Sequence, residues 1–176
     1  HFIGTQEVDI IWLYNKTMFD RLGLQPPATW DEFAAVSQAL SSAGETPIAI
    51  NYGWQLPQWV TQAYWQQYNQ PAKEIAKSQP GDYNYDAEVE YTWNVARFYR
   101  GIRDGLIRFD TDAMVQFITN IKRVFPQYAS DDLYVIQNTY PIWLQQQAAM
   151  IVDTSGALAR VTSDMQNLDN PSRLEE

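Results

Sequence analysis

The sequence predicts a helix-rich α/β domain with a small sheet. Short apolar runs typical of buried strands alternate with longer segments that show the 3.6-residue periodicity of helices. The chain has 176 residues, a length that suits one domain, or one lobe of a larger protein, with its own core. Strands are expected at 8–14, 47–51 and 148–152, and helices at 16–22, 30–43, 57–68, 87–104, 111–126, 131–146 and 156–167.

The opening strand and the first helix have clear boundaries in the sequence. The run from Val8 to Tyr14 is almost wholly apolar, which favours a strand. The segment Lys16 to Leu22 predicts a short helix that ends at Gly23, because glycine readily adopts the left-handed conformation that closes helices.

The second helix begins with a capping box. Thr29 stands at the N-cap and Glu32 three residues later, so each side chain can accept a hydrogen bond from the backbone N–H of the other residue. Gly44 ends this helix. The residues expected to bury its inner face are Phe33, Val36 and Leu40.

The middle of the chain is predicted as helix, loop and helix. Pro57 suits the first turn of a helix that reaches about Tyr68. The segment 69–86 is rich in polar residues and contains two prolines and a glycine, which favours a loop. The segment 87–104 has the most regular helical period and ends before Gly105. Its apolar stripe comprises Tyr91, Val95, Phe98, Tyr99 and Ile102.

Two further helices follow. Asp110 or Thr111 is expected to cap the first of them, which Pro126 limits. The second, over 131–146, can kink at Pro141. The apolar stripe of the first comprises Met114, Phe117, Ile118 and Ile121.

The chain closes with a strand, a helix and a tail. The apolar run 148–152 predicts the last strand, and Ser155 is expected to cap the helix over 156–167. Residues 167–176 form a polar tail.

The composition excludes several classes of function. With a net charge of −9, the chain lacks the basic surface that a nucleic-acid-binding protein needs, and an anionic membrane surface would repel the chain. The chain has no cysteine and a single histidine, His1, so it lacks a Ser-His-Asp triad, a cysteine nucleophile and the usual zinc ligands. No segment of 18 apolar residues predicts a membrane-spanning helix. We therefore expect no catalytic residues and no cofactor.

One segment partly matches a calcium-binding loop. Asp82, Asn84 and Asp86 have the spacing of its first ligands. The motif then requires glycine where Ala87 stands and glutamate where Trp93 stands. We therefore expect no metal here, and interpret the segment as a turn in which Asp86 caps the following helix.

Aromatic and amide side chains gather directly after the strand at 47–51. Aromatic residues make up 14% of the chain, and the cluster contains Tyr52, Trp54, Gln58 and Trp59. Flat apolar rings beside paired donors and acceptors suit a neutral, polyhydroxylated ligand. Open α/β sheets bind ligands at the carboxyl ends of their strands, where this cluster lies. The alternative is that Trp54 packs beneath the following helix.

One long motif near the start of the chain is typical of a known family. The stretch from Tyr14 to Phe19 (YNKTMF), followed by Gly23-Leu24, Pro27 and Thr29 to Phe33 (TWDEF), resembles a motif of the bacterial extracellular solute-binding proteins, particularly their carbohydrate-binding group that serves ABC importers.

Two later segments also resemble the family. They are Gly44 to Ile50 (GETPIAI), and Gln147 to Met150 (QAAM) followed by Ser155-Gly156. The sequence departs from the family where Gln147 replaces a frequent Gly-Lys and where Gly156-Ala157 replaces Gly-Ser-Trp, which weakens the case for a sugar contact from this loop.

The resemblance implies a periplasmic-binding-protein-like (type II) fold of two lobes that close on a ligand. Residues 1–176 would be mainly the C-terminal lobe, with the N-terminal lobe and the signal sequence before His1. The protein would be exported, either free in the periplasm or held at the outer face of the cytoplasmic membrane by a missing N-terminal anchor. Its partners would be a sugar or oligosaccharide and the permease subunits of an importer. By position, the rings that stack on sugar would be Trp54 and Trp59, and the polar contacts Tyr52, Gln58, Thr154 and Ser155.

Two other classes of function stay open from the residues. A glycan-active catalytic domain would need two carboxyl groups roughly 5–10 Å apart near Trp54. A helical interaction module would need an exposed apolar helix face, although a lobe separated from its other half could show such a face as well.

Overall fold

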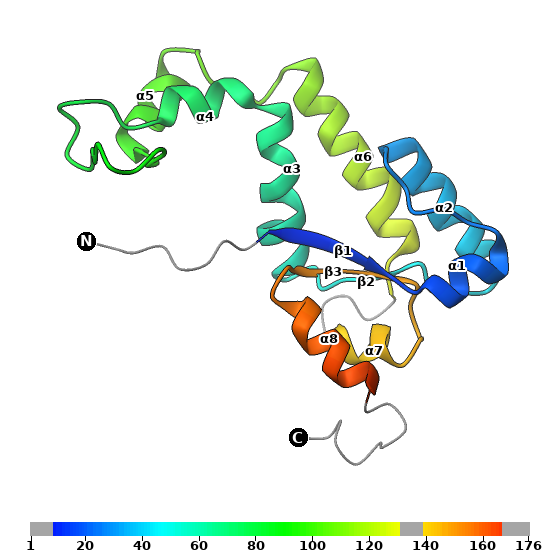
Figure 1. Cartoon of the computed structure of the whole chain (residues 1–176). Helices are drawn as coiled ribbons and strands as arrows, with labels where there is room; N and C mark the ends of the chain where they lie inside the picture. Colours follow the sequence, from blue (N-terminus) through cyan, green and yellow to red (C-terminus); the bar gives the residue numbers. More distant parts are fainter. Residues whose placement is uncertain (1–8, 131–138, 167–176) are drawn as a thin grey trace. The chain divides into compact units, whose positions relative to one another are not determined.

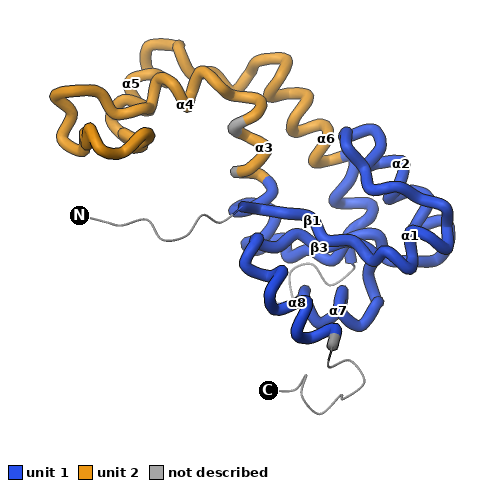
Figure 2. The backbone as a smooth tube through the Cα atoms, viewed as in Figure 1, with its two compact units in different colours: residues 1–60, 123–176 blue, residues 61–122 orange. Residues whose placement is uncertain are grey.

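The structure is a computed structural model that describes residues 9–130 and 139–166 (Figure 1). The chain divides into two compact units (Figure 2). The first unit comprises residues 1–60 and 123–176, and the second comprises residues 61–122.

A small mixed sheet organises the first unit. Its strands are β1 (Ile10–Tyr14), β2 (Ile48–Ala49) and β3 (Met150–Thr154), in the order β1-β3-β2. The last strand in sequence is therefore central, antiparallel to β1 and parallel to β2. The three strands confirm the prediction, but β2 has two residues and β3 lies two residues later than expected.

Helices cover both faces of this sheet (Figure 1). Successive residues of a strand point to opposite faces, and β1 follows this rule. Trp12 packs against Phe33 of α2 (Trp30–Ser42) and Phe125 of α6 (Asp112–Tyr128), with ring centroids 5.0 and 6.3 Å away. Leu13 joins the opposite core, which includes Trp143 of α7 (Tyr140–Leu144). The last helix, α8 (Ala157–Gln166), also packs on β3.

The helix boundaries predicted near the start of the chain are confirmed. Helix α1 (Lys16–Leu22) ends at Gly23, whose φ of 67° is left-handed. The Thr29 side chain accepts a hydrogen bond from Glu32 N at 3.2 Å, and the Glu32 carboxylate accepts one from Thr29 N, so the capping box of α2 is complete. The predicted core residues of α2 are buried: Phe33, Val36 and Leu40.

The second unit contains α3 (Thr61–Tyr68), α4 (Gln70–Ala76), α5 (Val95–Arg103) and the first part of α6. The loop predicted over 69–86 is therefore wrong for its first part. Pro71 lies in the first turn of α4, where a missing N–H costs nothing. The two helices α4 and α5 pack closely at Gly101, because a Cβ there would lie 2.8 Å from side-chain atoms of Ile75 and Ile107.

Helix α5 begins eight residues later than the predicted start at Ala87. Asn94 is its N-cap and accepts a hydrogen bond from Arg97 N at 3.0 Å. Asp86, predicted as the cap, instead accepts from Glu88 N within a turn. The predicted apolar stripe is also wrong, since Tyr91 lies outside the helix. Its members Val95, Tyr99 and Ile102 are exposed.

The later helices agree with the prediction in part. Thr111 accepts a hydrogen bond from Met114 N at the start of α6, but the helix continues past Pro126 to Tyr128. Met114 and Phe117 are buried as predicted, whereas Ile118 is exposed. Of the helix expected over 131–146, residues 131–138 lie outside the described residues, and Pro141 lies in the first turn of α7.

Candidate functional site

The parallel pairing of β2 and β3 defines the candidate site. Ile48 lies opposite Met150, and Ala49 lies opposite Ile151. This confirms the expectation that the two strands are neighbours. Because parallel strands end at the same edge of a sheet, the segments that follow Ala49 and Thr154 leave the sheet on one side.

A tight turn shapes the segment after β2. The Oδ1 atom of Asn51 accepts hydrogen bonds from Gly53 N at 2.7 Å and Trp54 N at 3.1 Å. A π-helix, η1 (Gln55–Val60), follows directly. Short π-helical segments occur frequently at functional sites.

This local structure brings Trp54 and Trp59 together. Their ring centroids are 4.5 Å apart and the ring planes are nearly perpendicular, at 84°. Edge-to-face packing of this kind is a favourable aromatic geometry. Both rings are half-buried, so each keeps part of its surface exposed. Tyr52, two residues before Trp54, is half-buried with its hydroxyl oxygen buried, and Gln58 is exposed.

The end of β3 carries the other predicted polar contacts, Thr154 and Ser155, both half-buried. Ser155 is tied to the start of β1. Its hydroxyl accepts a hydrogen bond from Asp9 N at 3.1 Å, and its own N–H donates to Asp9 O at 2.8 Å. Ser155 therefore has a structural role in addition to the binding role predicted for it.

A buried amide joins the two segments. Gln55 is 2% exposed, and its Nε2 donates to the carbonyl of Val152 at 3.2 Å. The structure thus places Tyr52, Trp54, Gln58 and Trp59 in one segment, and links that segment through Gln55 to the strand that ends at Thr154.

The sequence analysis missed a charged group next to Thr154. The Asp153 carboxylate accepts hydrogen bonds from Thr154 N at 2.7 Å and from Arg160 at 2.9 Å. The Arg160 guanidinium also lies 3.8 Å from the ring centroid of Tyr140. The Tyr140 hydroxyl donates to Asp164 at 2.7 Å. Burial, followed by this hydrogen bond, raises the pKa of Tyr140 to about 12, so the phenol is neutral at ordinary pH.

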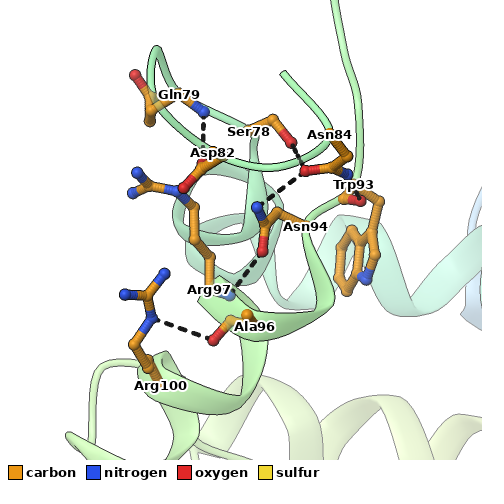
Figure 3. A network of polar contacts seen from close by, with 9 residues as sticks. All are labelled: Ser78, Gln79, Asp82, Asn84, Trp93, Asn94, Ala96, Arg97 and Arg100. Atoms are coloured by element: carbon orange, nitrogen blue, oxygen red, sulfur yellow. Dashed lines mark hydrogen bonds and ion pairs between the residues drawn. The ribbon is translucent and has the colours of Figure 1, made fainter. Parts of the chain in front are cut away.

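The partial calcium motif in the second unit is occupied by internal contacts (Figure 3). Asp82 accepts a hydrogen bond from Gln79 N at 2.8 Å and pairs with Arg97, and the hydrogen bond to Arg97 lowers the pKa of Asp82. The amide oxygen of Asn84 accepts from Ser78 at 2.8 Å and Asn94 at 2.9 Å. Within residues 9–130 and 139–166, no group of three or more His, Cys, Asp or Glu side chains could hold a metal ion.

Comparison with known proteins identifies the family. The family model for bacterial extracellular solute-binding proteins matches residues 9–171. The chain belongs to this family. A relative in Streptococcus mutans, the multiple sugar-binding protein, is 47% identical over 45 residues, which are 24% of this chain and 11% of that protein.

Solved structures show the same fold as this solute-binding protein. A chitin oligosaccharide binding protein superposes over 88% of the chain with a TM-score of 0.55 and 20% identity. RafE, solved in complex with raffinose, superposes over 89% with a TM-score of 0.56 and 18% identity. These likenesses confirm the predicted helix-rich, periplasmic-binding-protein-like fold.

The solute-binding protein chain spans about a third of the length of these structures, 34% and 36% respectively. Among the residues that the structure describes, no helix is both long and apolar enough to cross a membrane.

Proposed function

We propose that this chain is mainly the C-terminal lobe of the substrate-binding component of an ABC importer, and that it binds a neutral sugar or oligosaccharide without chemistry of its own. The family match supports solute binding. The named relative binds multiple sugars, which supports a sugar as the solute. The share of the solved structures that the chain spans supports the assignment to one lobe.

The observation that carries the proposal is the half-exposed pair of Trp54 and Trp59 at the carboxyl edge of β2 and β3. A sugar ring that stacks on one indole covers apolar surface on both partners, which contributes about 1–2 kcal/mol. The perpendicular packing fixes the two rings relative to each other, so little side-chain entropy is lost on binding.

The polar contacts proposed for sugar hydroxyls come from both segments of the site. Tyr52 precedes Trp54 and Gln58 precedes Trp59, while Thr154 ends β3 and Ser155 follows it. The Ser155 hydroxyl accepts from Asp9, so it would serve the ligand as a donor. In the intact protein the second lobe would supply the remaining contacts.

A glycan-active enzyme is less well supported by the acids of β3 and α8. Catalysis would need one carboxyl group that acts as an acid and another that acts as a base or nucleophile. Asp153 is held by Arg160, and Asp164 accepts from Tyr140. Both carboxylates therefore have structural partners, which favours binding over hydrolysis.

The family also supports a location outside the cytoplasm. We propose that the protein is exported and delivers its ligand to permease subunits, either free in the periplasm or tethered at the outer face of the cytoplasmic membrane by an anchor that precedes this chain.

Calorimetry on the protein in its natural length tests the proposal, with raffinose and chitin oligosaccharides as the first ligands and other neutral oligosaccharides after them. Trp54→Ala and Trp59→Ala should each weaken binding about tenfold, as expected from the loss of one stacking contact. Trp93→Ala is the matched control, because Trp93 is also partly exposed but lies in the second unit.

Failure of every sugar to bind, or an unchanged affinity in both Trp variants, would contradict the proposal. Release of shorter sugars during the titration would support the enzyme instead, and chromatography of the ligand after incubation detects it.

A further inference from the structure

We infer that Gln55 is a positioning residue. Its amide holds the segment that carries Trp54 and Trp59 in a fixed position relative to the end of β3. Its side chain is 2% exposed, although glutamine is usually a surface residue. The inference rests on the proposed function for its effect on ligand affinity, but its geometric content stands without a ligand.

Three hydrogen bonds converge on this amide from three separate segments. Its Oε1 accepts from Asn51 N at 2.7 Å and from Thr139 Oγ1 at 3.1 Å, and its Nε2 donates to Val152 O at 3.2 Å. Asn51 follows β2, Val152 lies in β3 and Thr139 precedes α7. Thr139 and Asn51 are themselves buried, so these bonds are shielded from water.

The two backbone partners dictate the chemistry of the side chain. The N–H of Asn51 can only donate and the carbonyl of Val152 can only accept, so the residue between them must present an acceptor on one side and a donor on the other. A carboxylate lacks the donor, and an apolar side chain of equal length lacks both. Glutamine is the residue of this length that satisfies both backbone groups.

The same contacts bear directly on the rings. Asn51, whose backbone N–H binds Gln55, forms the turn that fixes Gly53 N and Trp54 N through its own side chain. Gln55 is also the first residue of η1, which carries Trp59. Loss of the amide would therefore release both ends of the segment that holds the pair.

The test compares Gln55→Met and Gln55→Glu with the wild type, and uses Gln67→Met, an exposed glutamine of the second unit, as the matched control. Near-ultraviolet circular dichroism reports the packing of the indoles. The contribution of the pair is defined by its loss in Trp54→Phe and Trp59→Phe. Sugar affinity and the urea unfolding midpoint are measured on the same samples.

We expect Gln55→Met to lose the circular dichroism signal of the tryptophan pair. We also expect its sugar affinity to fall about tenfold, which is the effect of one lost stacking contact, while the Gln67→Met control keeps both the signal and the affinity.

Gln55→Glu provides a second test, which does not depend on whether the site tolerates methionine. Burial raises the pKa of a carboxyl at this position, and the protonated acid can donate to Val152 whereas the carboxylate cannot. The pair signal of Gln55→Glu should therefore be present while this carboxyl is protonated and lost as it ionises at higher pH. Asp153 and Arg160, the charged pair next to Val152, are shared with the wild type, whose signal should not change over the same pH range.

A wild-type pair signal in Gln55→Met, or in Gln55→Glu above the pH at which its carboxyl ionises, would overturn the inference. If the wild type binds no sugar, the proposed function fails and the spectroscopic arm still decides whether Gln55 positions the rings. If the wild type binds but Gln55→Met keeps its full affinity, the positioning role in binding is overturned while the proposed function stands.

Discussion

Arg160 donates a hydrogen bond to Asp153 at 2.9 Å, so a cation on α8 neutralises the carboxylate of a side chain that is 12% exposed at the end of β3. Arg160→Ala would leave that carboxylate without its charged partner. Because Arg160 is itself half exposed, we expect a loss of about 1–2 kcal/mol in the free energy of unfolding, below the value for a fully buried pair.

Urea denaturation measures this loss. Arg108→Ala serves as the control, since Arg108 pairs with Asp110 on the surface and its removal should change stability by less than about 0.5 kcal/mol. Equal effects of the two substitutions would show that burial of Asp153 contributes nothing.

Thr29→Ala should destabilise the protein by about 1 kcal/mol, because the N–H of Glu32 loses the acceptor that caps α2. Thr29→Ser keeps the hydroxyl and should stay within a few tenths of a kcal/mol of the wild type. Chemical unfolding of the three proteins checks both values. A serine variant as unstable as the alanine variant would assign the effect to the lost methyl group rather than to the cap.

The raised pKa of Tyr140 predicts a pH dependence of stability. The folded protein favours the neutral phenol, so its contribution is complete below the ordinary tyrosine pKa of 10.0 and is lost as the pH rises from there toward about 12. The free energy of unfolding should therefore fall more steeply above pH 10 in the wild type than in Tyr140→Phe. Unfolding curves between pH 9 and 11 measure the difference, and parallel curves would contradict the assigned burial of this hydroxyl.

Calcium should not bind the segment 82–86. Asp82 is paired with Arg97, and the Asn84 oxygen already accepts two hydrogen bonds, so binding would have to break these contacts. Calorimetry with millimolar calcium should give no heat above dilution. A saturable signal that disappears in Asp82→Asn would show that the ion displaces Arg97.

The sequence allowed prediction of elements whose signals are local. The capping box at Thr29 and the glycine at position 23 each act within a few residues, and both boundaries are confirmed. The sequence pattern does not predict the start of α5, because Asn94 caps this helix as part of a hydrogen-bond network with Asn84, ten residues earlier. The periodic pattern over 87–94 carried no information about that network.

The candidate site also combines contacts that are local in sequence with contacts that are distant. Trp54 and Trp59 are five residues apart, so the sequence alone predicts that they cluster. The group formed by Asp153, Arg160 and Tyr140 comes from β3, α8 and α7, and no spacing rule connects its members. Gln55 belongs to the sequence cluster around Trp54, but its partners Thr139 and Val152 come from distant segments, so no spacing rule predicts its buried role.

The strand order β1-β3-β2 has a consequence for biosynthesis. Strands β1 and β2 do not pair with each other. Each pairs with the central strand β3, which is the last of the three to be translated. At ordinary rates of translation, the apolar residues of β1 remain without their partner strand for roughly 7 to 30 seconds. During that time the nascent chain cannot complete this three-stranded sheet, so the sheet forms only after β3 has been synthesised.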